Sequence, residues 1–515
     1  MEKENTSHYP QPDRWSLLWL VIGTVLMVFI AGSWPLSLAG WLAPVFFIRL
    51  MRTHKVLWGF ILTVVGLSIA NTVGWWVQNP MPVPAPIFGT IVGLSSGLLF
   101  LVDRLLVPRL CGRDGRGLFA ATLVFPLFLT AFEFLFYSNL PYGSYGSWAY
   151  ANHSSLGLMQ LTSITGLWGL TFLTGWFASV VNWAWERSFS WPDIRGGAAI
   201  YGSILLLVLA YGGIRLTFSV PEAGTVRVHG ITAVEESGSK VLEEELALFE
   251  TDRDAFQRKI AGINELYLAG TVREAQAGAQ IVVWPETTFI GQEEDIDALI
   301  AQAGEVTRQE NIYLAISPAI YFPEDEHAEL RLIVIDPSGK VVINHLKYAY
   351  GKGDPLSEVE LQTVDTPYGR LSAVLCGDLD FPGVVQQAGQ KGVDILLVPG
   401  NESTAAEGLW HVRYAPFRAV ENGVSLVRQA TGGVSIVTDP YGRILASMTH
   451  STTKDRVMVA QVPTHRVSTI YSAVGDLFGW LTVAGFVIIA GWAIFRGRKT
   501  RVETASSTEA QAPSV

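Results

Sequence analysis

The chain has 515 residues, of which 49% are hydrophobic and only 16% are charged, and its formal net charge is −10. Soluble domains have about 25% charged residues, so this composition excludes an ordinary soluble protein and predicts that part of the chain lies in lipid. The acidic total argues against nucleic acid as a partner, because phosphate binding needs clustered Lys and Arg.

Eight apolar segments approach or reach the length that a bilayer-spanning helix needs, which is about 20 residues. In chain order they are Trp15–Trp34, Pro35–Ile48, Leu57–Val77, Ile87–Leu106, Leu118–Tyr137, Leu156–Val181, Ala198–Ile214 and Leu477–Phe495. The second is short and follows the first almost without a loop, so these two form either separate spans or a re-entrant pair. The first lacks a convincing signal-peptide cleavage site, and we expect it to be retained.

Positive charges occur in alternate loops of this series. Lys and Arg follow the second, fourth and sixth segments and occupy the C-terminal tail, whereas Gln78–Ala85 and Ser138–Ser155 contain none. Cytoplasmic loops of membrane proteins carry the excess of positive charge. Both termini are therefore predicted to be cytoplasmic, and the long region before the last segment is predicted to lie on the outer face of the inner membrane.

These patterns divide the chain into five parts. We expect a cytoplasmic N-terminus at 1–14, a bundle of seven transmembrane helices at 15–219, an exported domain at 220–470, a last transmembrane helix at 471–497 and a disordered cytoplasmic tail at 498–515. A single helix anchors a domain almost irreversibly. So many spans therefore indicate an active site that faces the bilayer and receives a lipid from it.

The region from Thr225 to Pro463 alternates short β-branched runs with charged helical stretches, which predicts a layered α/β domain. The predicted strands are Thr225–Val234, Ala279–Trp284, Ile312–Ile320, Leu330–Ile335, Leu371–Leu375, Val393–Val398, Val424–Arg428, Val434–Thr438 and Val457–Val462. The predicted helices are Ser239–Gln276, broken near Gly262, then Ile296–Gln309, Gly383–Lys391 and Gly408–Asn422.

The two cysteines, Cys111 and Cys376, are predicted to lie on opposite sides of the membrane, so they cannot pair. Cys376 would then be a lone thiol in an oxidising compartment. Such a residue is either a small buried core side chain or a reactive thiol, and the cysteine count alone favours the core.

Three stretches of this domain place chemistry-bearing residues at strand ends. In IVVWPET, Pro285 ends a strand before Glu286, and in DPSGKVVINHLK a turn launches a short strand that ends near Lys347. In GRLSAVLCGDLDFP, an apolar strand delivers Cys376. Each residue alone is ordinarily a surface charge or a core thiol. Together they supply a base, a cation and a nucleophile, which suffice to activate a thiol and hold an oxyanion.

The three motifs, in this order, resemble those of the nitrilase, or carbon–nitrogen hydrolase, superfamily. FRAVENGVSLVRQATGGVSIVTDPYG also resembles that family's Arg-Ala-x-Glu helix and the strand after it. The resemblance implies an α-β-β-α sandwich with a Glu-Lys-Cys triad. It implies that Glu286 is the general base, that Lys347 is the triad lysine and that Cys376 is the nucleophile.

Several spans, a nitrilase-like domain and one last span resemble the layout of the apolipoprotein N-acyltransferase family. The segment LPYGSYGSWAYANHSSLGLMQLTSITGLWGLTFLTGWFASVVNWAWE also resembles that family. The resemblance implies a phospholipid acyl donor, a thioester on the cysteine and transfer to the N-terminal amine of a lipoprotein. It implies no cofactor, and the sequence has neither a metal-ligand cluster of credible spacing nor a phosphate-binding glycine loop.

The sequence departs from the family around the expected substrate pocket. The Tyr-Glu expected after the nucleophile is Gly377-Asp378, and the aromatic residues expected after the family's Asn-Asp are absent after Asn401-Glu402. A second supporting glutamate has no clear match, and Asp354 or Glu358 could take its place. We therefore consider Asp378, Glu358, Asp354 and Asn401 as supporting residues.

Two features in the predicted bundle have more than one interpretation. Glu133 lies inside the fifth apolar segment, where an ionisable residue indicates a functional site unless it reaches the interface. The aromatic stretch Tyr142–Tyr150 is predicted to be an interfacial belt rather than a substrate rim.

Two other functions compete with acyl transfer. One is a membrane-bound amidase in which water is the acceptor. The other is a transporter or receptor whose exported domain only binds its ligand.

Overall fold

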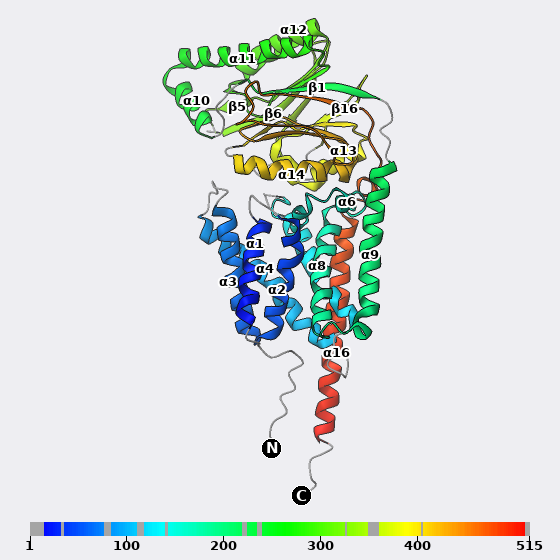
Figure 1. Ribbon diagram of the computed structural model, residues 1–515. Helices are drawn as coiled ribbons and strands as arrows, with labels where there is room; N and C mark the ends of the chain where they lie inside the picture. Colours follow the sequence, from blue (N-terminus) through cyan, green and yellow to red (C-terminus); the bar gives the residue numbers. More distant parts are fainter. Residues whose placement is uncertain are drawn as a thin grey trace.

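The computed structural model describes residues 15–31, 36–76, 84–110, 118–139, 143–218, 224–233, 239–324, 327–348, 360–402 and 405–509. These residues form a helical bundle with an α/β domain on one end of it (Figure 1). The helix α16 (Leu477–Glu509) passes through the bundle and points away from the α/β domain. Cys111 lies outside the described residues.

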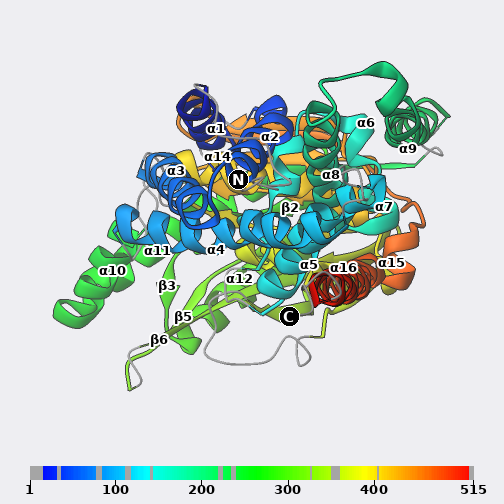
Figure 2. The ribbon, with the colours of Figure 1, turned by 90° about the horizontal axis from the view of Figure 1, so that it is seen from below.

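The bundle follows the apolar segments predicted from the sequence. Its helices are α1 Ser16–Ala31, α2 Ser37–Thr53, α3 Val56–Trp76, α4 Ala85–Leu106, α5 Val124–Tyr137, α6 Leu156–Met159, α7 Thr162–Thr165, α8 Leu167–Trp185, α9 Trp191–Phe218, α15 Ile470–Val474 and α16. The short 3₁₀ helices η1 Val107–Leu110, η2 Phe119–Leu123 and η3 Trp148–Asn152 complete it. Seen from below, α16 lies beside α5 (Figure 2).

Within the part of the chain that the structure describes, five helices are long and apolar enough to cross a membrane, or six if one bent pair counts as a span. The eight spans expected from the sequence are therefore confirmed only in part. The helices α1 and α2 have 16 and 17 residues, which is short for a span. In addition, α2 contains Pro44, Arg49 and Arg52.

The predicted span Leu156–Val181 is broken into two pieces that meet at 119°. Gly166 lies at the break with φ of 62°, a conformation that favours glycine. A Cβ atom there would lie 2.5 Å from the Tyr471 ring, so the close packing of that ring also requires glycine. The sequence predicts one continuous span here because its composition is apolar throughout. The bend is set by tertiary packing and not by composition.

Helices α3 and α4 pack closely because α4 presents a row of glycines to α3. A Cβ atom on Gly89 would lie 2.3 Å from Thr72 Oγ1, and one on Gly93 would lie 2.3 Å from Ser68 Oγ. Small residues spaced by four let two membrane helices approach closely, which is how such helices gain packing energy in lipid.

The described residues of the α/β domain form 16 short strands and five helices. The strands are β1 Thr225–Ile231, β2 Ile281–Val283, β3 Ile290–Gly291, β4 Tyr313–Ile316, β5 Ala319–Phe322, β6 His327–Ile335, β7 Val341–Leu346, β8 Thr363–Thr366, β9 Gly369–Ala373, β10 Ile395–Leu397, β11 Gly400–Asn401, β12 Ser425–Arg428, β13 Ala430–Thr431, β14 Val434–Thr438, β15 Ile444–Thr449 and β16 Val457–Pro463. The helices are α10 Ser239–Thr251, α11 Arg253–Gln276, α12 Glu293–Glu310, α13 Pro382–Gln390 and α14 Ala405–Asn422.

Two sheets face each other in this domain. One has the order β16-β1-β2-β4-β6-β5-β3 with β7 beside β6, and the other has the order β15-β14-β12-β10-β9-β8. Side chains such as Val228, Val283, Leu371 and Leu397 fill the space between the sheets. Helices α11 and α12 cover the outer face of the first sheet, and α13 and α14 cover the second on the side of the bundle (Figure 1). The predicted α-β-β-α sandwich is therefore confirmed.

Three details of the prediction are wrong. The long first helix breaks at Asp252, whose side chain accepts a hydrogen bond from Ala255 N and caps α11, rather than at Gly262. The predicted strand Ile312–Ile320 is split between β4 and β5 around Pro318, since proline cannot donate a sheet hydrogen bond. The helix α16 continues to Glu509, past the start of the tail expected to be disordered, because a helix already nucleated in a span extends at little cost.

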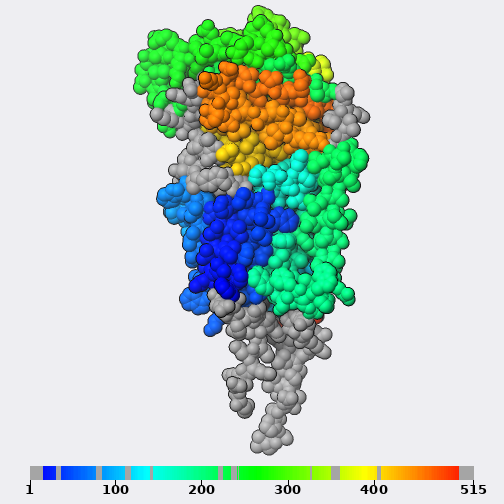
Figure 3. All heavy atoms as spheres, viewed as in Figure 1, coloured from blue at the N-terminus to red at the C-terminus, as the bar shows by residue number. Residues whose placement is uncertain are grey.

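The two parts of the protein meet over the outer face of α14. Figure 3 shows the atoms of the segment between α5 and α8, in cyan, directly beneath those of the α/β domain. Tyr150 and Trp148 of this segment are buried. Tyr150 packs against Tyr414 of α14, and Trp148 packs among the residues of the bundle, so the interfacial belt predicted for this stretch is wrong for these residues. Tyr142 lies outside the described residues.

Candidate active site

Parallel strands bring the predicted nucleophile and base to the same edge of the domain. In the second sheet, β9, β10 and β12 run parallel, so their carboxyl ends lie together. Cys376 follows β9, and its N–H donates to Pro399 O at 2.8 Å. Glu286 follows β2 of the first sheet, and its N–H donates to the next carbonyl, Gly400 O, at 3.3 Å. The two residues are thus held by adjacent peptide groups after β10.

The backbone of Cys376 has an unusual conformation. Its φ of 24° lies in the positive range that side chains other than glycine rarely adopt. The residue begins the 3₁₀ helix η5, Cys376–Asp380, immediately after the strand. Strained positive φ values cluster at functional sites, where the surrounding structure holds them in place. Of the two interpretations of Cys376, this turn favours a reactive thiol over a core side chain.

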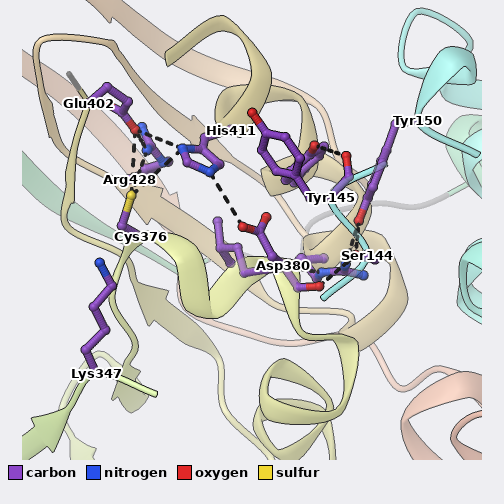
Figure 4. A network of polar contacts seen from close by, with 12 residues as sticks. Ser144, Tyr145, Tyr150, Lys347, Cys376, Asp380, Glu402, His411 and Arg428 are labelled. Atoms are coloured by element: carbon purple, nitrogen blue, oxygen red, sulfur yellow. Dashed lines mark hydrogen bonds and ion pairs between the residues drawn. The ribbon is translucent and has the colours of Figure 1, made fainter. Parts of the chain in front are cut away.

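Glu286 and Lys347 form a buried ion pair. Lys347 Nζ donates to Glu286 Oε1 at 2.7 Å, and the side chains are 12% and 2% exposed. Burial acts to lower the pKa of Lys347, but the charges of Glu286 and then Cys376 outweigh it and raise the pKa above its ordinary value. Lys347 is therefore a permanent cation. Figure 4 shows its ammonium group directed toward Cys376.

Asp378 connects the strand that carries Lys347 to the strand that carries Cys376. Its carboxylate accepts hydrogen bonds from Tyr348 N at 3.0 Å and from Leu375 N at 2.9 Å. His345 Nε2 lies 2.8 Å from the same carboxylate. The three contacts fix the residues next to the lysine and the cysteine. Asp378 therefore links the two segments through contacts to their backbone, and its supporting role in catalysis stays a prediction.

Three other charged side chains surround the thiol. Cys376 Sγ lies 3.8 Å from Glu402 Oε1, 3.6 Å from Arg428 Nη2 and 4.0 Å from His411 Nδ1. Glu402 and Arg428 also form an ion pair with each other. All three side chains are buried in the α/β domain. None of these three residues was predicted from the sequence to be part of the site.

His411 is held between the thiol and a carboxylate. Its Nε2 lies 3.6 Å from Asp380 Oδ2, at the end of η5. Burial acts to lower the pKa of His411, but Cys376 and then Asp380 raise it well above its ordinary value. The imidazole can therefore hold a proton beside a thiolate. His411 thus lies between Cys376 and Asp380 in space (Figure 4).

The membrane-facing segment 143–152 is bonded directly to this network. Ser144 donates from both N and Oγ to Asp380 O, each at 2.7 Å. Arg418 of α14 donates to Ser144 Oγ at 2.8 Å and to the Tyr150 hydroxyl at 2.6 Å. The Tyr145 ring stacks on Trp410 at 5.6 Å. The turn η5, which begins at Cys376, is thus anchored to the bundle.

Glu133 secures the same segment from below. Its carboxylate accepts hydrogen bonds from Ser147 Oγ at 2.9 Å, Trp148 N at 2.9 Å and Thr171 Oγ1 at 2.8 Å. The side chain is 3% exposed. Of the two interpretations of Glu133, reaching the interface does not fit this burial, and its contacts assign it a positioning role.

The cluster formed by Cys376, Glu402 and His411 has ligand atoms that all lie within 4.8 Å of one another. However, Arg428 donates to both the thiol and the glutamate. A guanidinium in that position supplies the positive charge that a metal would bring. The donor set therefore fits an activated thiol better than a metal site.

Comparison with known proteins agrees with this geometry. The model of the carbon–nitrogen hydrolase family matches residues 255–471. The apolipoprotein N-acyltransferase of Geobacter metallireducens is 25% identical over 421 residues, which cover 74% of this chain and 76% of the relative. That of Azotobacter vinelandii is 23% identical over 549 residues, which cover 96% of this chain and 98% of the relative. The chain is related to the apolipoprotein N-acyltransferases.

Among solved structures, an amidase from Nesterenkonia sp. matches at 20% identity with a TM-score of 0.36, over 48% of this chain and 94% of the amidase. The resemblance to apolipoprotein N-acyltransferases predicted from the sequence is confirmed, and so is the nitrilase-like domain. This relationship and the five to six apolar helices support a membrane-bound enzyme of the N-acyltransferase type.

The other predicted supporting residues are placed unevenly. Asn401 lies in β11, two residues after Pro399, whose carbonyl accepts the hydrogen bond from Cys376 N. The Oδ1 atom of Asn401 is buried without a hydrogen-bond partner among the described residues. Asp354 and Glu358 lie outside the described residues. The sequence gives little indication that Glu402, Arg428 and His411 belong to the site, since an Arg at a strand end or a His on a helix is ordinarily exposed or structural.

Proposed function

We propose that this protein is an N-acyltransferase that moves a fatty acyl chain from a phospholipid, through a thioester on Cys376, to the N-terminal amine of a lipoprotein. The observation that carries this proposal is the position of the buried Glu286–Lys347 pair at the strand ends that hold Cys376. The names of the relatives support the donor and acceptor classes.

The first half-reaction forms the thioester. Glu286 takes the proton of the Cys376 thiol, and the sulfur attacks the carbonyl carbon of a phospholipid ester. Lys347, already a cation, stabilises the negative oxygen of the tetrahedral intermediate. The carbon–oxygen bond then breaks, Glu286 returns the proton to the leaving oxygen, and a lysophospholipid departs. In the second half-reaction, the acceptor amine attacks the thioester carbon and the Cys376 sulfur leaves.

The supporting residues assist this triad in different ways. Asp378 keeps Lys347 and Cys376 in register through its backbone contacts. We propose that the amide of Asn401 faces the pocket because its Oδ1 is buried and unpaired among the described residues. Asp354 or Glu358 would supply the second carboxylate, as the resemblance to the family implies.

We propose that all eight apolar segments cross the inner membrane and that the α/β domain lies on its outer face. The charge asymmetry of the loops supports this orientation. Arg52, near the C-terminal end of α2, forms a buried ion pair with Asp103 and a partly buried one with Glu186, which supports α2 as a helix of the membrane bundle. The domain boundaries would then fall near 14, 219, 470 and 497.

An amidase with water as acceptor is the second candidate. It is favoured by the match to the carbon–nitrogen hydrolase family and by the departures from the family motifs near Asn401. A transporter or receptor would not need the strained turn at Cys376. The fate of the acyl chain separates these functions.

The direct test is to incubate the purified full-length protein with phospholipid in detergent and to measure its intact mass. An acyltransferase gains one fatty acyl group, which peptide mapping places on Cys376 and which hydroxylamine removes. Cys376→Ala should gain no acyl group, whereas Cys111→Ser, the matched control on the other cysteine, should gain it like the wild type.

An adduct that persists in Cys376→Ala would contradict the proposal, and so would a wild type that gains none. Turnover of a simple amide without a lasting phospholipid adduct would identify a hydrolase. Neither an adduct nor turnover would identify a binding protein.

A further inference from the structure

On the side of Cys376 that faces away from Lys347 lies the imidazole of His411 (Figure 4). His411 Nδ1 lies 4.0 Å from Sγ, and its Nε2 lies 3.6 Å from Asp380 Oδ2. We infer that His411 is the catalytic base of the acceptor half-reaction, which removes the proton from the attacking amine, and that Asp380 positions it. This inference rests on the proposed acyl transfer and adds a residue to its second step.

The surroundings of His411 leave Asp380 as its working carboxylate. Glu402 Oε1 lies 3.5 Å from Nδ1, but its charge is already paired with Arg428. Asp380 has no such cation, and its Oδ1 is buried without a hydrogen-bond partner among the described residues. The ionisable groups that face the imidazole from each packed element are Cys376 and Asp380 of η5, Glu402 after β11, Arg428 of β12, Tyr145 of the segment 143–152 and Tyr414 of α14.

Acylation of the thiol changes the charge that His411 experiences. A thiolate on Cys376 is the largest influence that raises the pKa of His411, while burial acts in the opposite direction. A thioester carries no charge, so its formation removes that influence. Burial then has less opposition, which favours a neutral imidazole in the acyl-enzyme that can accept a proton. Imidazole also titrates near neutral pH, which suits a base that must deprotonate an amine.

The proposed step balances atoms and charge. The neutral amine attacks the thioester carbon, and a carbon–nitrogen bond forms. His411 takes the proton from that nitrogen while the carbon–sulfur bond breaks, and Cys376 leaves as a thiolate beside an imidazolium. The proton then passes from His411 to the sulfur, which restores the thiol that Glu286 deprotonates in the next cycle. The products are the amide and the resting enzyme.

The position of the imidazole suits an acceptor that is anchored in the membrane. His411 lies on α14, the helix that faces the bundle (Figure 1), and its ring lies 5.8 Å from that of Tyr145. Asp380 is held by Ser144 through its carbonyl oxygen, so the carboxylate stays free for His411. The base is therefore built at the junction between the α/β domain and the bundle.

The two half-reactions can be separated to test this role. The enzyme is first loaded with phospholipid, the excess donor is removed, and a diacylglyceryl-cysteine peptide is added while the thioester is followed by intact mass. In His411→Gln we expect loading within about tenfold of wild type and discharge to the peptide slower by about 100-fold or more, the range for loss of a general base. Asp380→Asn should slow the same step less, and the exposed His465→Gln is the matched control.

Discharge by hydroxylamine separates a catalytic base from a purely structural residue, because damage to the pocket would slow this discharge and loss of a base would not. This nucleophile needs no general base at neutral pH, so it should discharge the thioester of His411→Gln as fast as that of wild type. Peptide transfer at the wild-type rate in His411→Gln would overturn the inference, and so would equal losses of loading, peptide transfer and hydroxylamine discharge. A wild type that never forms the thioester would instead reject the proposed function itself.

Discussion

Buried charges serve different purposes in the bundle and in the α/β domain. Glu133, in the apolar helix α5, accepts three hydrogen bonds from its neighbours. Around Cys376, by contrast, Asp380 Oδ1 and Glu402 Oε2 are buried without a hydrogen-bond partner among the described residues. A carboxylate whose oxygens are all hydrogen-bonded holds its neighbours in place, whereas a carboxylate with an unpaired oxygen can interact with a substrate. The comparison therefore assigns scaffolding to the bundle and chemistry to the domain.

The largest expected effect is on the domain side of this comparison. Replacement of Lys347 by Met removes the cation that faces the oxyanion, so acyl loading should fall by about 10²–10³-fold. The measurement is the rate of thioester formation by intact mass. Lys391→Met is the control, because Lys391 forms an ion pair with the exposed Glu360 at the surface. If both variants load at the wild-type rate, the ion pair of Lys347 with Glu286 is structural and the comparison fails.

Glu133 tests the bundle side. Glu133→Ala leaves three buried donors without their acceptor, and each unsatisfied group costs about 1–3 kcal/mol. We expect a lower melting temperature in detergent, while Glu133→Gln, which keeps one carbonyl acceptor, should lose less. A Glu133→Ala protein that melts like the wild type but has lost all acyl loading would show that Glu133 takes part in the chemistry.

Ser144 lies where the two regions meet and should give the smallest effect. Ser144→Ala removes a donor to Asp380 O, an acceptor for Arg418 and the hydrogen-bond partner of the Tyr150 hydroxyl. The backbone bond from Ser144 N remains. Loss of three such hydrogen bonds costs about 1.5–4 kcal/mol, and we expect loading to slow by less than tenfold. An undiminished stability, measured by thermal unfolding, would mean that the junction does not depend on this side chain.

The sequence predicts the parts of the site that depend on local pattern. Glu286, Lys347 and Cys376 each follow a strand, and α/β domains collect their functional residues at strand ends, so their proximity could be expected even though they lie on two sheets. Helix α14 was likewise predicted, as Gly408–Asn422, from its charged helical stretch. The roles of the three triad residues stay predictions until the loading experiment is done.

The features that the sequence does not predict depend on tertiary contacts. His411 and Arg428 are ordinary polar residues of a helix and a strand until the fold buries them beside the thiol. Gly166 lies within an apolar run, and only the approach of the Tyr471 ring reveals the bend there. The count of eight spans is confirmed only in part, because hydropathy does not show where an apolar run bends.

The central claim is that an acyl chain passes from phospholipid through Cys376 to an amine. The most direct measurement places the full-length protein in liposomes of phospholipid with one isotopically labelled acyl chain, together with a diacylglyceryl-cysteine peptide, and follows the label by mass spectrometry. The account predicts that the label appears as an amide on the peptide's N-terminal amine and that Cys376→Ala abolishes it. Label found only as free fatty acid, or transfer that survives in Cys376→Ala, would contradict it.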